Sequence, residues 1–252
     1  MKTDHYFISD LHLGSPDAAS SRDRERKVIA FLEGIEKTCH SLYILGDLFD
    51  YWFEYAQVVP KGHVRLLGHL AKMVDAGTQL HIFTGNHDLW MTGYLADELG
   101  ATVHYNPLQL TLNGKSFYLA HGDGLGPGDR KYKFMKAVFK SPVSQWLYRR
   151  FHPNFGVGFA AKMSQLSRAS QSSEDHNYLG EKELQLQHSK TLLNGQHIDF
   201  FLYGHRHHKA DVTLASPTTS GESRYLVLGD WITLNTYARW DGITLTLNTF
   251  TP

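Results

Sequence analysis

Short apolar runs alternate with helical patterns along the first 90 residues. The runs at residues 6–9, 42–45 and 80–84 are nearly continuously hydrophobic and are bounded by Gly, Asp or Asn, which is typical of strands buried on both faces of a sheet. Between them, apolar residues recur at helical spacing over residues 22–38 and 62–76. This order of strand, helix, strand, helix, strand predicts βαβ units around a parallel sheet.

The pattern changes after residue 105, where strands follow one another more closely. Asn113-Gly114 predicts a hairpin turn between strands at residues 108–112 and 116–120. Further strands are expected at residues 200–203, 225–228 and 243–247. We therefore expect a second, partly antiparallel sheet and an α/β sandwich, formed as a single domain over residues 1–252.

Residues 124–197 interrupt the strands and are expected to form a helical insert, with one helix over residues 132–151 and two more helical stretches. Residues 130–170 contain nine Lys and Arg and no Asp or Glu, which leaves 16 basic against 25 acidic residues elsewhere. The same stretch is rich in Phe, Trp, Leu and Val. Such a helix is often simply packed and solvated, but the missing acids and the broad apolar face favour contact with a lipid or a membrane surface.

Composition excludes several other classes of protein. The 252 residues include 25 Lys and Arg, 25 Asp and Glu and one cysteine, Cys39. A neutral total argues against a dedicated nucleic-acid binder, and one cysteine excludes an internal disulfide and zinc sites built on paired cysteines. We see no apolar run of the length of a signal peptide or a membrane-spanning helix, so we expect neither export by that route nor a membrane span.

Polar residues follow five of the predicted strands at their carboxyl ends. In open α/β sheets ligands gather at this edge, so these loops are expected to converge on one site. The five segments are Asp10-Leu11-His12, Gly46-Asp47, Gly85-Asn86-His87-Asp88, His121-Gly122-Asp123 and Gly204-His205-Arg206-His207.

The residue types in these loops suit divalent metal ions. Carboxylate, imidazole and amide ligands bind Mn²⁺, Fe, Zn²⁺ or Mg²⁺, and seven of them suffice for two ions if one carboxylate bridges. Two such ions can hold a hydroxide and clamp the attacking and leaving oxygens of a displacement at phosphorus. The glycines before Asp47, Asn86 and His205 would let the backbone turn sharply and approach the site closely.

In order and spacing, the five segments resemble the motif series of calcineurin-like metallophosphoesterases, over essentially the whole chain outside the insert. The resemblance implies a four-layer αββα sandwich of two mixed sheets. It also implies that His87, held by Asp88, acts on the phosphoryl or leaving-group oxygen. The implied ligands are Asp10, His12, Asp47 and His207 for one ion and Asp47, Asn86, His121 and His205 for the other, with Asp47 bridging.

Residues 43–52, the short loop 10–14, His121-Gly122-Asp123 and the insert further resemble the UDP-2,3-diacylglucosamine pyrophosphatases of lipid A synthesis. That resemblance implies a lid over acyl chains and metal-hydroxide attack that releases UMP and 2,3-diacylglucosamine 1-phosphate. It also implies two divalent ions, with Mn²⁺ preferred over Mg²⁺, Zn²⁺ or Fe. The protein is then expected at the cytoplasmic face of the inner membrane. The best-known members carry Arg where this chain has His87.

Other readings of the same residues remain open. A soluble phosphodiesterase or phosphatase would keep the metals but would have no use for an apolar, basic insert, and a non-catalytic scaffold would be expected to lose ligands. Asp50 and Asp123 could orient histidines, or Asp50 could cap a helix, whereas Asp230 is expected to serve turn and packing roles. The candidate substrate-binding residues of the insert are Arg149, Arg150, Lys162 and Arg168; no nucleic-acid or protein partner is indicated.

Overall fold

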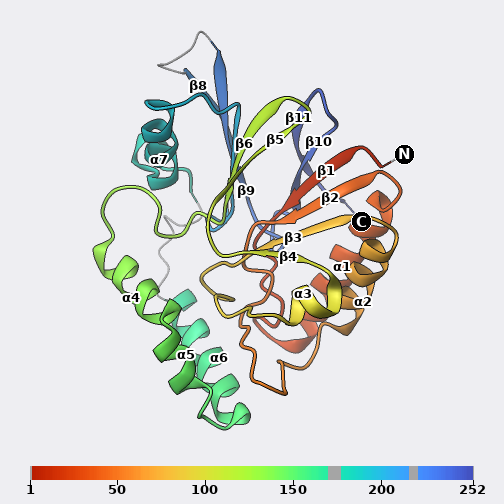
Figure 1. The fold of residues 1–252 in the computed structure, drawn as a ribbon, viewed down its shortest axis with the longest axis vertical. Coiled ribbons are helices and arrows are strands. Elements are labelled where there is room, and N and C mark those ends of the chain that lie inside the picture. The colour runs from red at the N-terminus through yellow and green to blue at the C-terminus, as the bar shows by residue number, and fades with distance from the viewer. Residues whose placement is uncertain (1, 170–176, 216–220, 252) are drawn as a thin grey trace.

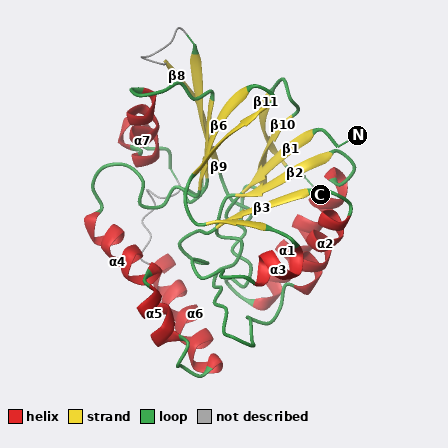
Figure 2. Ribbon diagram, in the orientation of Figure 1, coloured by secondary structure: helices red, strands yellow, loops and turns green. Residues whose placement is uncertain are grey.

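In a computed structural model, the protein forms two mixed β-sheets packed face to face, with helices on both outer sides (Figures 1 and 2). The structure describes residues 2–169, 177–215 and 221–251. The chain passes from the first sheet to the second and returns to the first through its last two strands.

The first sheet has the order β11-β10-β1-β2-β3-β4. Strands β1 to β4 run parallel, while β10 pairs antiparallel with both β1 and β11. The parallel part contains the predicted βαβ units, since α1 and α2 connect its first three strands. The bounds are β1 (Asp4–Ile8), α1 (Ala18–Ile35), β2 (Cys39–Ile44), α2 (Val64–Asp75), β3 (Gln79–Phe83), α3 (Tyr94–Leu99), β4 (Thr102–His104), β10 (Thr236–Trp240) and β11 (Leu245–Thr249).

The second sheet has the order β5-β6-β7-β9-β8, with β6, β7 and β9 parallel at its centre. The two edge strands β5 and β8 pair antiparallel with their neighbours. The sheet is therefore partly antiparallel, as the sequence predicts. Its elements are β5 (Leu108–Leu112), β6 (Lys115–Ala120), α7 (Leu184–Leu193), β7 (Phe200–Tyr203), β8 (Lys209–Ala215) and β9 (Glu222–Leu228).

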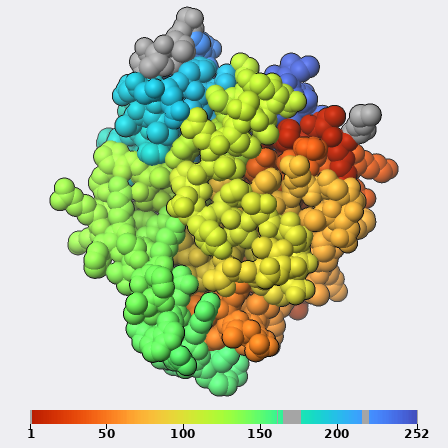
Figure 3. Space-filling view, in the orientation of Figure 1, coloured from red at the N-terminus to blue at the C-terminus, as the bar shows by residue number. Residues whose placement is uncertain are grey.

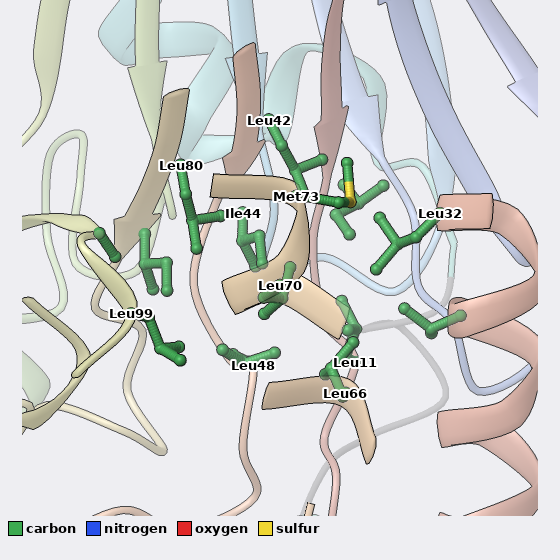
Figure 4. Close-up of a cluster of buried hydrophobic side chains, with 14 of the residues drawn as sticks. Leu11, Leu32, Leu42, Ile44, Leu48, Leu66, Leu70, Met73, Leu80 and Leu99 are labelled. Atoms are coloured by element: carbon green, nitrogen blue, oxygen red, sulfur yellow. The ribbon is translucent and has the colours of Figure 1, made fainter. Parts of the chain in front are cut away.

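Three apolar cores divide the molecule into four layers. One lies between the first sheet and helices α1 and α2, where Leu66, Leu70 and Met73 of α2 face the strand residues Leu42 and Ile44 (Figure 4). The second core fills the space between the sheets, and the third joins the second sheet to α7. This confirms the four-layer αββα sandwich. Because α7 forms its outermost layer, only the earlier part of the predicted insert stands apart from the sandwich.

That earlier part forms three helices, α4 (Arg130–Lys140), α5 (Pro142–Tyr148) and α6 (Pro153–Ala169), which we call the insert helices. They lie beside one another, away from α1, α2 and α3 (Figure 1). The prediction of one helix over residues 132–151 is wrong, because Ser141 ends α4 in extended backbone and Pro142 opens α5. Residue 170, the last of the predicted basic stretch, and residues 171–176 lie outside the described residues.

The sequence did not indicate β4, β8, β10 or α3. Strands β8 and β10 alternate buried and more exposed positions along their length, so they have no continuous apolar run. Strand β4 has three residues and α3 has six, which is too short for a periodic pattern to stand out.

Candidate metal centre

The five polar loops meet at the carboxyl ends of β1, β2, β3, β6 and β7, as the sequence predicts. Three groups of side chains bring possible ligand atoms within 4.8 Å of one another. Asp47 and His12 each belong to two of these groups, so the groups form one continuous cluster. The groups are Asp10, His12 and His207; His12, Asp47 and His87; and Asp47, His121 and His205.

Asp47 lies at the centre of this cluster. Its Oδ2 atom is 3.4 Å from His12 Nε2 on one side and 3.4 Å from His121 Nε2 on the other. Its Oδ1 atom accepts a hydrogen bond from the backbone N–H of His87 at 3.0 Å. The carboxylate is 1% exposed. Its position between the two sets of histidines is the one that a bridging ligand requires.

Asp10 and His12 contain buried polar atoms with no hydrogen-bond partner among the described residues. Asp10 Oδ2 accepts hydrogen bonds from the Ser9 hydroxyl and the His205 backbone N–H, but its Oδ1 has none. His12 Nε2 also has none, and it lies 3.6 Å from that oxygen. Unpaired buried polar atoms are costly, so these two atoms point to a ligand between them.

Three of the predicted ligand histidines have an oxygen close to their other ring nitrogen. His12 Nδ1 lies 3.4 Å from Asp50 Oδ1, and His207 Nδ1 lies 3.1 Å from Asp230 Oδ2. His121 Nδ1 lies 2.8 Å from the Leu45 carbonyl, while its Nε2 lies 3.1 Å from Asn86 Oδ1. Metal-binding histidines usually have such acceptors, which fix the tautomer and the ring orientation.

The electrostatics of the cluster favour a cation. Burial acts to lower the pKa of His121, but the Asp47 carboxylate outweighs it and raises that pKa to about 10. Burial also works against ionisation of Asp47, yet His121 and the neighbouring histidines hold its pKa well below the usual range. A proton on His121 thus supplies positive charge that divalent ions would supply instead.

The backbone at the ligands is unusual for residues other than glycine. Asp10, His12, Asp47 and His205 have φ values of 56°, 43°, 50° and 69°. This left-handed conformation is costly for residues with a side chain and is enriched at functional sites. A Cβ atom on Gly46, Gly85 or Gly204 would collide with His121, Asp47 or Ser9. The predicted close approach is therefore present at all three glycines.

These observations fit a dimetal site. The unpaired ligand atoms, the anionic centre at Asp47 and the imidazole nitrogens around it match the oxygen and nitrogen ligands that divalent transition ions bind. The family model for calcineurin-like phosphoesterases matches residues 6–209. The chain is a calcineurin-like phosphoesterase.

The phosphoesterase has relatives of similar length. It is 41% identical to a UDP-2,3-diacylglucosamine hydrolase of Porphyromonas gingivalis, over 98% of this chain and 97% of that protein. A protein of the same name from Hahella chejuensis is 31% identical over 93% and 92% of the two chains. Another, from Pseudomonas aeruginosa, is 27% identical over 89% and 90%.

His87 of the phosphoesterase is positioned differently from the sequence prediction. Asp88 does not hold its ring: the Asp88 carboxylate accepts hydrogen bonds from the backbone N–H groups of Gly85 and Phe49. Burial and the nearby Asp47 raise the pKa of Asp88 to about 7. The His87 ring instead places Nδ1 3.2 Å from the Asp50 carbonyl and 3.1 Å from Ser164 Oγ. Asp88 thus shapes the loop, and Asp50 contacts the ring.

The insert helices reach the phosphoesterase site through a few polar contacts. Lys136 Nζ of α4 lies 2.6 Å from the buried Asp123 Oδ2, and the Tyr132 hydroxyl donates to the same oxygen. In α5, the Tyr148 hydroxyl lies 3.1 Å from that of Tyr51. In the space-filling view these helices cover one flank of the molecule, in green at the lower left (Figure 3). None of the described helices is long and apolar enough to cross a bilayer.

Among the described side chains, Arg149, Arg150 and Lys162 of the insert have no recorded contact with the metal cluster. Arg149 is exposed and lines a surface cavity with residues of the loop 54–59 and of α3. The Arg150 guanidinium lies 4.7 Å from the centre of the Trp146 ring. Lys162 is exposed on α6. Arg168 is also in α6, but its side chain lies outside the described part of the structure. All four remain predictions.

Three site residues were missed or undervalued. Asp230 accepts the turn hydrogen bonds that were expected of it, from Ile232, Thr233 and Leu234, but it also contacts His207. The signal was present, because Leu228-Gly229-Asp230 ends a strand as Leu45-Gly46-Asp47 does. Nothing in the sequence separates Ser164 or Lys136 from the other serines and lysines of the insert.

Proposed function

We propose that this phosphoesterase hydrolyses the pyrophosphate bond of UDP-2,3-diacylglucosamine to UMP and 2,3-diacylglucosamine 1-phosphate. The observation that carries the proposal is the presence of unburied apolar helices attached directly to a dimetal site. A nucleotide or phosphoprotein enzyme has no use for such a surface next to its metals. The names of the near full-length relatives support the same substrate.

The insert helices supply a surface for acyl chains. No residue of α4 or α5 is buried, although both helices are rich in large apolar side chains. Phe134, Val143 and Trp146 are 73%, 65% and 54% exposed, and Phe155 of α6 is 61% exposed. A concentration of exposed apolar side chains of this kind usually marks a binding surface. Two fatty acyl chains would cover it while the pyrophosphate lies at the metal cluster.

The predicted metal ligands and His87 have different roles in the proposed reaction. Asp10, His12, Asp47 and His207 would hold one divalent ion and Asp47, Asn86, His121 and His205 the other, and we propose Mn²⁺ for both. Such ions supply Lewis-acid activation of water and neutralise charge at phosphorus. Asp50 and Asp230 keep His12 and His207 oriented. His87 would place its Nε2 atom at the phosphoryl or leaving-group oxygen, where it stabilises the developing charge or provides a proton.

The same helices would bring the protein to its substrate at the cytoplasmic face of the inner membrane, as a peripheral protein. Arg130, Lys131 and Lys162 are exposed on them, beside the apolar side chains. Lys133, Lys136 and Lys140 instead bind Gly126, Asp123 and Tyr105 of the sandwich. Basic residues beside apolar ones favour the surface of an anionic bilayer.

The decisive assay measures release of UMP from UDP-2,3-diacylglucosamine and from the same sugar nucleotide without acyl chains. Each is tested with Mn²⁺, Mg²⁺ and Zn²⁺, next to a simple chromogenic phosphodiester. We expect rapid UMP release from the acylated substrate and turnover at least about 100-fold slower without acyl chains, because the binding energy of the chains is lost. Equal rates on both sugar nucleotides would instead favour a soluble phosphodiesterase.

A further inference from the structure

We infer that Ser164 of the insert helix α6 is a positioning residue for His87, and that it fixes the ring tautomer with which His87 meets the substrate. The inference rests on the proposed function, in which His87 acts at the reacting phosphate. It concerns one hydroxyl group that links the insert to the metal centre.

The side chains of Asp50, Ser164 and His87 form a continuous hydrogen-bonded chain. The Ser164 hydroxyl donates to Asp50 Oδ2 at 2.9 Å, and its oxygen lies 3.1 Å from His87 Nδ1. Ser164 is 9% exposed and Asp50 is 7% exposed. Since the hydroxyl proton is given to the carboxylate, the Ser164 oxygen is left as an acceptor for the imidazole.

A second contact decides where the imidazole proton lies. His87 Nδ1 is 3.2 Å from the Asp50 backbone carbonyl, and a carbonyl oxygen can only accept a hydrogen bond. Both neighbours of Nδ1 therefore require it to carry the proton. In the neutral ring this leaves Nε2 with a free lone pair, and in the charged ring it leaves Nε2–H as the group that can be donated.

Ser164 belongs to the insert, whereas Asp50 and His87 belong to loops of the sandwich. The chain of hydrogen bonds is complete only while α6 lies against these loops. Docking of the helix that carries the acyl-binding surface would thus also set the orientation of the catalytic ring. This couples recognition of the lipid part of the substrate to the chemistry at phosphorus.

The first test is structural and does not depend on turnover. The protein is labelled with ¹⁵N in its histidine rings and loaded with Mg²⁺, and the His87 signals are assigned by comparison with His87→Gln. We expect the Nδ1–H tautomer in the wild type and a smaller share of it in Ser164→Ala, because only the Asp50 carbonyl then remains to accept a hydrogen bond from Nδ1. The Nε2–H tautomer in the wild type, or no change in Ser164→Ala, would overturn the inference.

The second test uses kinetics on the chromogenic phosphodiester, which has no acyl chain to engage the insert. We expect Ser164→Ala to lower kcat about 10-fold with KM within about 2-fold, Ser164→Thr to restore it, and Ser144→Ala in α5 to have no effect. In a His87→Ala background, Ser164→Ala should cause no further loss, because the two residues act as one unit. A full further loss would show a merely structural role. Failure of the wild type to cleave UDP-2,3-diacylglucosamine would reject the proposed function but leave the tautomer result standing.

Discussion

The loops of the metal centre and the insert helices differ in what holds their side chains in place. Asp10 and Asp47 are 0% and 1% exposed and are fixed by backbone hydrogen bonds from loops that follow parallel strands. Phe134 and Phe155 are 73% and 61% exposed, and their helices are joined to the sandwich by contacts at a few positions such as Lys136, Tyr148 and Ser164.

This difference follows from what each region has to do. Chemistry at phosphorus needs ligands held to within about 0.5 Å, which a rigid sheet edge provides at the cost of strained backbone. Acyl chains are flexible and carry few polar groups, so they need apolar area rather than exact geometry. A substitution in the centre, or at an insert residue such as Ser164 that contacts it, should therefore affect every substrate, whereas one on the exposed apolar side chains of the insert should affect only acylated substrates.

The largest effect is expected from Asp47→Ala, because this carboxylate would be shared by both ions. We expect turnover of the acylated substrate and of the simple phosphodiester to fall together, by about 1000-fold or more, and bound metal to fall below two ions per chain. Metal content is measured on the purified protein and rates by UMP and chromophore release.

The matched control for this change is Asp211→Ala, since Asp211 lies in a surface ion pair with Arg224 on the edge strand β8. It should retain both activities and its metal content. An Asp47→Ala protein with full metal content and rate would contradict the assignment of the centre.

A smaller and selective effect is expected from the double variant Trp146→Ser/Phe155→Ser on the insert helices. Removing two exposed aromatic rings takes away apolar contact for the acyl chains, so KM for UDP-2,3-diacylglucosamine should rise about 10-fold. The rate on the chromogenic phosphodiester should stay unchanged, because the metal centre is untouched. Thermal stability should also be retained, since neither ring is buried.

Ile243→Ser serves as the control for lost surface hydrophobicity, since Ile243 is 87% exposed in the turn between β10 and β11 of the sandwich. It should leave KM for the acylated substrate unchanged. If the Trp146→Ser/Phe155→Ser variant lost activity equally on the acylated substrate and on the chromogenic phosphodiester, the insert helices would not be specific for acylated substrates.

The same difference explains how far the sequence could predict the structure. Residues such as Asp10 and Asp47 directly follow buried strands, and the carboxyl ends of parallel strands meet at one edge, so their convergence could be expected. Asp230 follows β9 in the same way, and its contact with His207 was within reach of the same rule. An α/β sandwich could be predicted for a related reason, because continuous apolar runs mark strands that are covered on both faces, whereas its four layers were implied by the family resemblance.

The sequence could predict where the insert lies but not how its helices are divided and packed. Its composition predicts helices, and Ser141-Pro142 is a local signal for the break between α4 and α5. The separation of α7 from α4, α5 and α6 instead depends on what each helix packs against. Ser164 contacts His87 because of the angle at which α6 meets the loops, and no local pattern encodes that angle. The family resemblance implies that Asp88 holds His87, whereas the Asp88 carboxylate accepts hydrogen bonds from the backbone of Gly85 and Phe49.

The smallest expected effect is a loss of stability in acid, which we attribute to a histidine of the sandwich. His81 of β3 stacks on Tyr43 at 4.6 Å, and its Nδ1 lies 3.1 Å from His104 Nε2. Burial, with smaller contributions from His104 and His5, lowers the pKa of His81 from 6.5 to about 4. Between these pH values His81 therefore binds a proton in the unfolded chain but not in the folded chain. As a result, the free energy of unfolding falls as the pH falls from about 6.5 to about 4.

His81→Phe keeps the stacking and removes this titration, so its Tm should fall less than that of the wild type between pH 7 and pH 4.5. Because the ring is partly solvated, we expect only about 1 kcal/mol, which is a difference of about 2–4 °C for a protein of this size. Thermal unfolding followed by circular dichroism at both pH values measures it, with His152→Phe at an exposed position before α6 as the control. An equal fall of Tm in wild type and His81→Phe would show that the acid sensitivity of the sandwich arises elsewhere.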